Sequence, residues 1–405
     1  MAEPAAPTIL CLSSYEKGAP FLEECKRQGW RVVLITVPAL EHSDFWPRAV
    51  IDEFYCMPDL ADTPSVLRGV AYLARTLRIE RVIPLDEYEL TTVSAIREHL
   101  RLAGMSESAT RFVRDKLAMR LRAAAHELPV PPFVHVLNHD AIRDFLDRVP
   151  APWLIKPRSE ASTIGIRKLA TPDEAWAAIE ELGDDRSNYL IERFISGNVL
   201  HADSVVAHGS VAFVEVHRYA RPPLEVFHQG GIASTATVRR DAPEAARIRE
   251  LNEQVLAALG VENSATHMEF IQAHEDGRIY FLEVAARVGG AYIANVVEAA
   301  TGVSLWAEWA KLETLTPGAA YQAPAPRHNY AGVIISLARQ EWPDTSAYQD
   351  PEIVWRLHKA NHAGFVVTSP NHDRVVALLD QYARRFSEDF LASMPPWTAK
   401  PPSNS

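Results

Sequence analysis

The segment between residues 267 and 287 restricts the fold most, because it pairs two apolar strands with a strong turn signal. The strands are predicted at His267–Ala273 and Arg278–Val284, with the dipeptide Asp276-Gly277 between them. This pattern is typical of a β-hairpin, so part of the chain must form an antiparallel sheet.

The length of the hairpin loop decides whether its two central glutamates face each other. A two-residue Asp-Gly turn sets Glu269 opposite Val284, whereas a three-residue loop over 275–277 sets Glu269 opposite Glu283. The longer loop needs a left-handed residue in its last position, and Gly277 stands there. We therefore expect the carboxylates of Glu269 and Glu283 to be directly opposed.

Two opposed carboxylates destabilise a sheet unless a cation neutralises them. Oxygen ligands with room for water suit Mg²⁺, as one or two ions, with Mn²⁺ as the alternative. Alternation places His267 on the same strand face as Glu269, and Arg287 on the same face as Glu283. A guanidinium next to a metal is typical of a phosphate site. A solvated sheet face is the simpler interpretation, and His267 fits either a substrate contact or a structural role.

Two lysines are candidates for the same site. Lys156 closes the apolar strand Trp153–Lys156, and Lys116 lies in the first turn of a predicted helix. The loop at 159–165 follows Lys156, and its small residues, with Ser162 and Gly165 among them, allow backbone N–H groups to approach phosphate oxygens. Most lysines are simply solvated, so neither lysine identifies a site alone.

Strands and helices alternate in the first hundred residues. Short apolar runs at 9–12, 31–37 and 81–85 are separated by helical segments, which predicts a parallel sheet covered by helices. No G-x-G-x-x-G follows the first strand, so a dinucleotide site is not indicated. Asp86 and Glu87 end the last of these strands, where open α/β sheets place ligands, and one of them is a candidate for a substrate amine.

Length and charge narrow the class of protein. A chain of 405 residues is too long for one ordinary core, so two or three compact units are expected. The net charge of −11 argues against a nucleic-acid partner, which needs a basic surface. No apolar run is long enough to span a bilayer, no basic leader is present, and the three cysteines show no C-x-x-C spacing. We expect a cytoplasmic protein with reduced thiols.

Taken in order, these segments resemble the ATP-grasp superfamily over roughly residues 81–313. The matching motifs are Arg114-Asp115-Lys116 before Val130-Pro131, Lys156-Pro157 before Ser162 and Gly165, the hinge at 190–197, Glu269-Phe270, and Glu283-x-x-x-Arg287-x-Gly289-Gly290. The resemblance implies an α/β fold with α+β lobes. Its implied parts are an N-terminal parallel-sheet domain (1–110), a small lobe (111–190), a large lobe with the metal hairpin (191–313) and a C-terminal α+β segment with a disordered tail (314–405).

The resemblance also implies a role for each matching residue. Phosphates of ATP would be bound by Lys116 and Lys156, with Ser162 and Gly165 in a lid over them. The adenine pocket would be lined by Glu192, Phe194 and Ile195. Glu269 and Glu283 would hold Mg²⁺, and Arg287 would bind the transferred phosphoryl group or an acyl phosphate.

Three positions depart from the family pattern. Ala285 replaces an Asn that often serves as a third metal ligand, and the run Glu-Val-Ala-Ala-Arg at 283–287 is similar to the bacilysin-type L-amino-acid ligases. Val199 replaces a Glu that often binds ribose, so His201 or Asp203 is expected to take that contact. The lid is poor in glycine.

The resemblance implies an ATP-dependent carboxylate–amine ligase that forms an amide, dipeptide-like if the carboxylate is an amino acid, through an acyl phosphate. Two alternatives stay open: a biotin- or purine-type carboxylase that activates bicarbonate, and an ATP-binding sensor without turnover. Candidate substrate contacts are Glu87, His228, His267 and Arg287. The expected partners are small-molecule carboxylates and amines, and a homodimer is allowed.

Overall fold

The computed structural model describes residues 6–161, 163–316, 318–392 and 403. The predicted disordered tail at 395–405 lies outside these residues, apart from residue 403, and Ser162 lies outside them as well. Within the described part of the chain, no helix is both long enough and apolar enough to cross a bilayer.

Four parallel strands form the N-terminal sheet, as the alternating pattern predicts. In spatial order they are β3 (Glu53–Cys56), β2 (Arg31–Thr36), β1 (Thr8–Leu12) and β4 (Ile79–Pro84). Every residue of β1 is buried, because helices cover both faces of a parallel sheet. The covering helices are α1 (Ala19–Arg27), α2 (Thr63–Leu73) and α3 (Leu90–Leu100). The helix α3 and the half-buried edge strand β3 were not predicted from the sequence.

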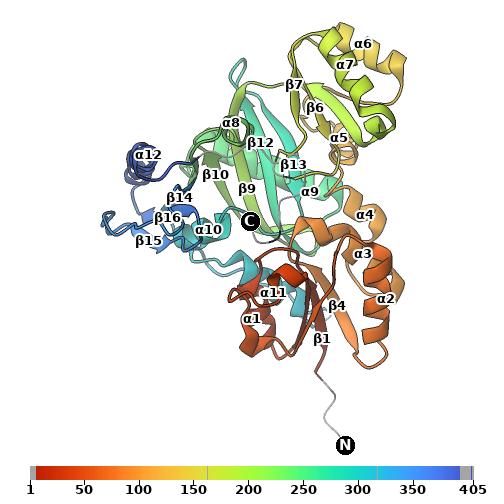
Figure 1. Cartoon of the computed structure of the whole chain (residues 1–405), viewed down its shortest axis with the longest axis vertical. Coiled ribbons are helices and arrows are strands. Elements are labelled where there is room, and N and C mark those ends of the chain that lie inside the picture. The colour runs from red at the N-terminus through yellow and green to blue at the C-terminus, as the bar shows by residue number, and fades with distance from the viewer. Residues whose placement is uncertain (1–5, 162, 317, 393–402, 404–405) are drawn as a thin grey trace, which may run out of the picture.

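A second, antiparallel sheet of four strands forms the small lobe, at the upper right of Figure 1. Its spatial order is β5 (Phe133–His135), β8 (Tyr189–Arg193), β6 (Trp153–Pro157) and β7 (Arg167–Leu169). The helices α6 (His139–Arg148) and α7 (Pro172–Leu182) pack on it around the buried Trp153. The helices α4 (Glu107–Arg111) and α5 (Lys116–Ala125) lead into this lobe from the N-terminal domain.

An eight-stranded antiparallel sheet is the centre of the molecule. Its spatial order is β13 (Ile279–Ala285), β12 (Ser264–Ala273), β9 (Gly197–Ala207), β10 (Ser210–Tyr219), β11 (Ala233–Thr237), β14 (Tyr330–Leu337), β16 (His362–Ser369) and β15 (Ile353–Arg356). The helix α9 (Pro243–Leu259) covers it through a buried apolar stripe that includes Ile248, Leu251 and Val255. The remaining helices are α8 (Pro223–Gln229), α10 (Ile293–Thr301), α11 (Leu305–Thr314) and α12 (His372–Asp389).

The C-terminal segment after residue 313 shares a sheet with the large lobe. Its strands β14, β16 and β15 extend the large sheet, because β11 pairs with both β10 and β14. Figure 1 shows these strands and α12 at the left end of that sheet. The helix α11 instead returns to the N-terminal domain, where Trp309 packs on Phe21 of α1 at 5.1 Å between ring centroids.

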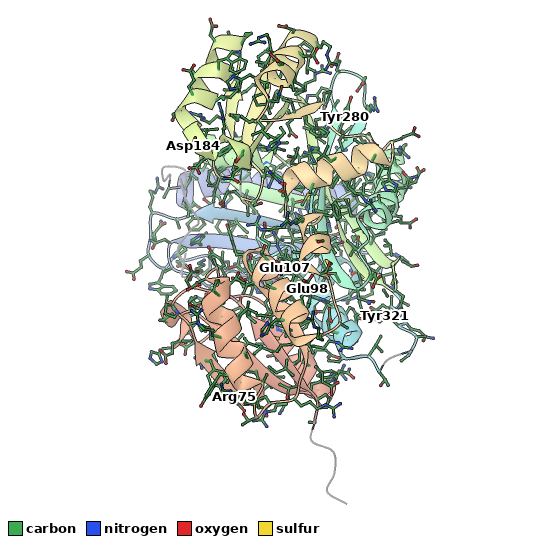
Figure 2. The ribbon with its side chains drawn as sticks, turned by 90° about the vertical axis from the view of Figure 1, so that its right-hand side faces the viewer. Arg75, Glu98, Glu107, Asp184, Tyr280 and Tyr321 are labelled. Atoms are coloured by element: carbon green, nitrogen blue, oxygen red, sulfur yellow. The ribbon has the colours of Figure 1, made fainter. Side chains whose placement is uncertain are left out.

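The hairpin β12–β13 reaches the small lobe at its far end. Arg193 at the end of β8 pairs with Glu275 of the hairpin loop at 2.8 Å, and the amide of His274 donates to the carbonyl of Ser196 at 2.9 Å. In Figure 2, Tyr280 of β13 lies in the upper part of the molecule with Asp184 of the small lobe, and Arg75 lies far below in the N-terminal domain. The hairpin therefore forms one wall of the space between the two lobes.

Candidate active site

The register of the hairpin places its two glutamates directly opposite each other. Glu269 of β12 pairs with Glu283 of β13, and His267 pairs with Ala285. The prediction of facing carboxylates is therefore confirmed. Gly277 has the expected positive φ, of 73°.

The path to this register is not the predicted one. The loop has four residues, 274–277, because the amide of Ala273 donates to the carbonyl of Arg278 at 2.9 Å. That loop alone would set Glu269 opposite Leu282, but a bulge at Leu282 shifts the ladder back by one residue. The carbonyl of Leu282 accepts a hydrogen bond from Arg120 of α5. The three-residue loop was wrong, and the bulge restores the pairing it implied.

A cavity of about 360 Å³ lies between the small-lobe sheet and the hairpin. It brings together many of the predicted nucleotide and metal residues, namely Lys116, Lys156, Glu192, Phe194, Ile195, Glu269 and Glu283. The lid predicted after Lys156 also lines it, through Glu160, Thr163 and Ile164. Segments that are far apart in the sequence thus meet in one site, and the roles of these residues stay predictions.

Both hairpin carboxylates have polar neighbours that fix their position. The hydroxyl of Tyr219 donates to Oε1 of Glu269 at 3.0 Å, and Nε2 of His267 lies 3.6 Å from the same oxygen. Burial alone would raise the pKa of Glu269, but the imidazole of His267 and the hydroxyl of Tyr219 lower it. Oε2 of Glu283 lies 2.9 Å from Nζ of Lys116. The two carboxylates face each other, and that of Glu283 is partly exposed to solvent. Such a pair of oxygen ligands with access to water fits a hard divalent cation such as Mg²⁺.

Lys116 also connects the metal side to the lid. Its Nζ donates to the carbonyl of Glu160 at 2.6 Å while it pairs with Glu283. The side chain of Asp115 caps α5 by accepting from the amides of Leu117 and Ala118, which holds Lys116 at the start of the helix. The ammonium group of Lys116 is therefore held in a fixed position in the cavity, where it can bind an anion.

Lys156 belongs to a buried ion cluster that the sequence did not reveal. Its Nζ lies 2.5 Å from Oε1 of Glu192, and Arg120 pairs with Oε2 of the same carboxylate at 3.0 Å. Burial lowers the pKa of Lys156 to about 8, and the nearby charge of Arg120 adds to this, although Glu192 opposes it. Glu192 lines the cavity as expected, but its carboxylate forms ion pairs with Lys156 and Arg120.

We expect ATP affinity to fall as the pH rises past the pKa of Lys156. Phosphate oxygens favour the charged ammonium, and its fraction in the free protein declines above about pH 8. Between about pH 7 and about pH 9 the Kd for ATP should rise by up to about tenfold. Titration calorimetry in buffers of different ionisation enthalpy should also detect proton uptake on binding.

Lys156→Arg is the matched variant for this test, because a guanidinium stays charged over the whole range. Its ATP affinity should change little with pH. If the wild-type affinity is the same at both pH values, Lys156 does not contact phosphate.

Arg287 crosses from the hairpin to the N-terminal domain, where it forms an ion pair with Glu87. Burial alone would lower the pKa of Arg287, but the carboxylates of Glu87, Asp86 and Glu283 raise it. Burial likewise would raise the pKa of Glu87, but Arg287 and Arg114 lower it to about 2. Both side chains are charged at neutral pH and each is 11% exposed.

The ribose prediction for His201 and Asp203 is wrong. Both side chains are fully buried within the large sheet and have no surface with which to contact a ligand in the cavity. Their neighbours Asn198 and Val199, at the start of β9, line the cavity in their place.

The other predicted residues divide into three groups. His267 is on the face of Glu269 and has an 11% exposed side chain. Gly165 does not line the cavity, although its φ of 71° explains the glycine at the end of the lid. Ser162 and the side chain of His228 lie outside the described residues.

Comparisons with known proteins agree with this architecture. Residues 149–295 match the ATP-grasp domain. The L-arginine-specific L-amino acid ligase of Bacillus subtilis is 23% identical over 261 residues, which are 63% of this chain and 62% of that protein. A D-alanine–D-alanine ligase of Ralstonia nicotianae is 27% identical over 210 residues, which are 50% of this chain and 62% of that one. The matches thus span less than two thirds of these relatives.

Solved structures share the fold over nearly the whole chain. An L-amino acid ligase from Bacillus licheniformis has a TM-score of 0.77 at 16% identity and covers 95% of this chain and 98% of its own. The N5-carboxyaminoimidazole synthetase of Staphylococcus aureus has a TM-score of 0.71 at 14% identity, with 93% and 96% covered. The chain therefore carries an ATP-grasp domain and has the fold of the ATP-grasp ligases, the family that its motifs resemble.

Proposed function

We propose that this chain is an ATP-dependent carboxylate–amine ligase whose carboxylate substrate is an amino acid. The observation that carries the proposal is the buried Arg287–Glu87 ion pair, in which Arg287 lies close enough to the metal-site carboxylate of Glu283 for that charge to raise its pKa. The relatives named as L-amino acid ligases and D-alanine–D-alanine ligases support the same class.

The ion pair matches the two charges of an α-amino acid. A zwitterion carries its carboxylate and its ammonium group on one carbon, so the two charges are close together. The carboxylate would be held by Arg287, in the bidentate manner that guanidinium allows, and the ammonium group by Glu87. Glu87 is the reason to prefer an amino acid over bicarbonate, which has no cationic group to pair with it.

Each group of the cavity has a place in the reaction. Lys116 and Lys156 hold the phosphates of ATP, and a cation between Glu269 and Glu283 would neutralise charge on the phosphate oxygens. A carboxylate oxygen of the amino acid attacks the terminal phosphorus, the bond to the bridging oxygen breaks, and ADP leaves. The deprotonated amine of the second substrate then attacks the acyl carbon, and inorganic phosphate leaves.

Glu87→Gln should weaken amino-acid binding more than it slows the chemistry. The amide keeps the shape and a hydrogen-bond acceptor but loses the charge that pairs with the substrate ammonium group. Since a hydrogen bond to a charged group contributes about 1.5–3 kcal/mol, KM for the amino acid should rise by roughly tenfold to a hundredfold. Steady-state kinetics at saturating ATP would measure this rise.

The control for that variant is Glu23→Gln, on the exposed side of α1, which should leave KM unchanged. An unchanged KM in Glu87→Gln would mean that Glu87 only supports Arg287. The ammonium group would then have to bind elsewhere.

Hydroxylamine trapping tests the proposed activity. With ATP, Mg²⁺, pooled amino acids and hydroxylamine, the protein should form an amino-acid hydroxamate and release ADP, because hydroxylamine intercepts activated acyl groups. AMP and pyrophosphate would contradict the mechanism.

The carboxylase alternative has one observation in its favour, because structural neighbours include carboxylating enzymes solved with ADP. ATP turnover that needs bicarbonate and no amino acid would favour it. Absence of turnover with intact ATP binding would favour a sensor, although a sensor has no need of Lys116, Lys156, Glu269, Glu283 and Arg287 together.

A further inference from the structure

Three histidines and one aspartate lie together on one face of the large sheet, next to the proposed catalytic cavity. His201 and Asp203 lie on β9, His217 on β10 and His267 on β12. Strand register places them on one face, since His217 pairs with His201 and Asp203 pairs with His267. His201, Asp203 and His217 are fully buried.

The side-chain atoms converge on a small volume. Nδ1 of His201 lies 2.6 Å from Oδ2 of Asp203, and Nδ1 of His267 lies 2.8 Å from Oδ1. One ligand atom from each of these three residues lies within 4.8 Å of the others. Residue 289 closes the cluster, because a Cβ added to Gly289 would lie 2.9 Å from Oδ1 of Asp203 and 3.1 Å from Nδ1 of His267.

His217 is the feature that ordinary hydrogen bonding does not explain. Neither of its ring nitrogens has a hydrogen-bond partner among the described residues, and its ring stacks on His201 with 4.8 Å between centroids. Its Nδ1 is aimed into the cluster, 3.3 Å from Oδ2 of Asp203. A buried polar group without a hydrogen bond costs free energy unless another ligand satisfies it.

The hydrogen bonds of His201 also point to a ligand between its ring and Asp203. The hydroxyl of Thr235 donates to the carbonyl of Arg218 at 3.0 Å, so its oxygen is left to accept from Nε2–H of His201, 2.9 Å away. With its proton on Nε2, a neutral His201 turns the lone pair of Nδ1 toward a carboxylate oxygen. Two acceptors face each other there, and a cation between them resolves the conflict.

We propose that His201, Asp203, His217 and His267 bind a divalent transition-metal ion of the Zn²⁺ class. Imidazole nitrogens and one carboxylate oxygen suit such an ion, whereas the oxygen pair of Glu269 and Glu283 suits Mg²⁺. Four protein ligands with no open position define a structural site, and an outward ring nitrogen that donates to a neighbouring oxygen is typical of histidine ligands. The ion would link β9, β10 and β12 to one another, on the same face of the sheet as Glu269 and next to it.

Metal analysis of the wild-type protein tests this proposal first. An untagged preparation, dialysed against buffer with Mg²⁺ and no other divalent ion, should retain about one Zn²⁺ per chain. Metal-free protein refilled with Co²⁺ should show the visible absorption of a four-coordinate nitrogen and oxygen site, which added Zn²⁺ removes. Protein that holds no transition metal and gives no Co²⁺ absorption would overturn the proposal.

Variants then assign the ligands. His217→Ala should weaken Co²⁺ binding at least about tenfold, since even outer partners of a metal site contribute that much. The exposed His42→Ala and the Mg²⁺-site variant Glu283→Gln should keep the Co²⁺ absorption unchanged. If His217→Ala binds Co²⁺ as tightly as wild type, the ion is bound elsewhere and the proposed site is wrong.

Discussion

Glu269→Gln and Glu283→Gln are each expected to lower turnover by at least about a hundredfold, because each removes one of the two charges proposed to hold the cation at the transferring phosphate. Glutamine keeps the size and a hydrogen-bond acceptor of glutamate. The hydroxyl of Tyr219 can still donate to residue 269, so the hairpin should keep its register. The Mg²⁺ dependence of turnover should shift to higher concentrations in both variants.

The fold should survive because the lost ion pair is partly solvated. Glu283 is 35% exposed where it pairs with Lys116, and such a pair contributes about 1 kcal/mol or less to stability. Glu275→Gln is the matched control, since Glu275 lies on the same hairpin with 73% of its side chain exposed. Normal activity in either site variant would show that the hairpin face is only a solvated surface.

Arg287→Lys is expected to lower kcat by about a hundredfold and to raise KM much less. Lysine keeps the positive charge beside Glu87 but loses the planar pair of donors that binds a carboxylate or phosphoryl group. That contact strengthens as charge develops during transfer, so its loss reduces kcat. The two parameters should be separated by steady-state kinetics with the amino acid varied.

Arg278→Lys, at an exposed residue just before β13, is the matched control and should behave as wild type. If Arg287→Lys raises KM and leaves kcat intact, Arg287 binds the substrate equally in the ground state and the transition state. Its proposed part in the chemistry would then be wrong.

The sequence predicts local elements well where the pattern is periodic. The bounds of α7 and α9 are marked in the sequence, because Pro172 and Pro243 stand in their first turns and Gly183 and Gly260 follow their ends. The facing glutamates were predicted from strand alternation and one glycine. Their loop length and the bulge at Leu282 were not predicted, and the bulge carbonyl accepts its hydrogen bond from Arg120, which is 162 residues away.

Long-range contacts account for the remaining errors. Arg120 and Tyr219 were missed because their carboxylate partners lie 72 and 50 residues away. The C-terminal strands join the large sheet through β11, whose small residues give no apolar signal in the sequence. His201 and Asp203 share a face with Glu269, but alternation does not tell how far along the sheet the cavity extends.

In the proposed mechanism, a substrate carboxylate oxygen attacks the terminal phosphate of ATP. An amino acid labelled with ¹⁸O in both carboxylate oxygens tests this step directly, when it is incubated with the protein, ATP, Mg²⁺ and an amine acceptor. Mass spectrometry of the released inorganic phosphate should find one ¹⁸O atom in each molecule, because the attacking oxygen leaves with the phosphate. Unlabelled phosphate, or label in AMP, would rule out attack by the carboxylate on the terminal phosphate.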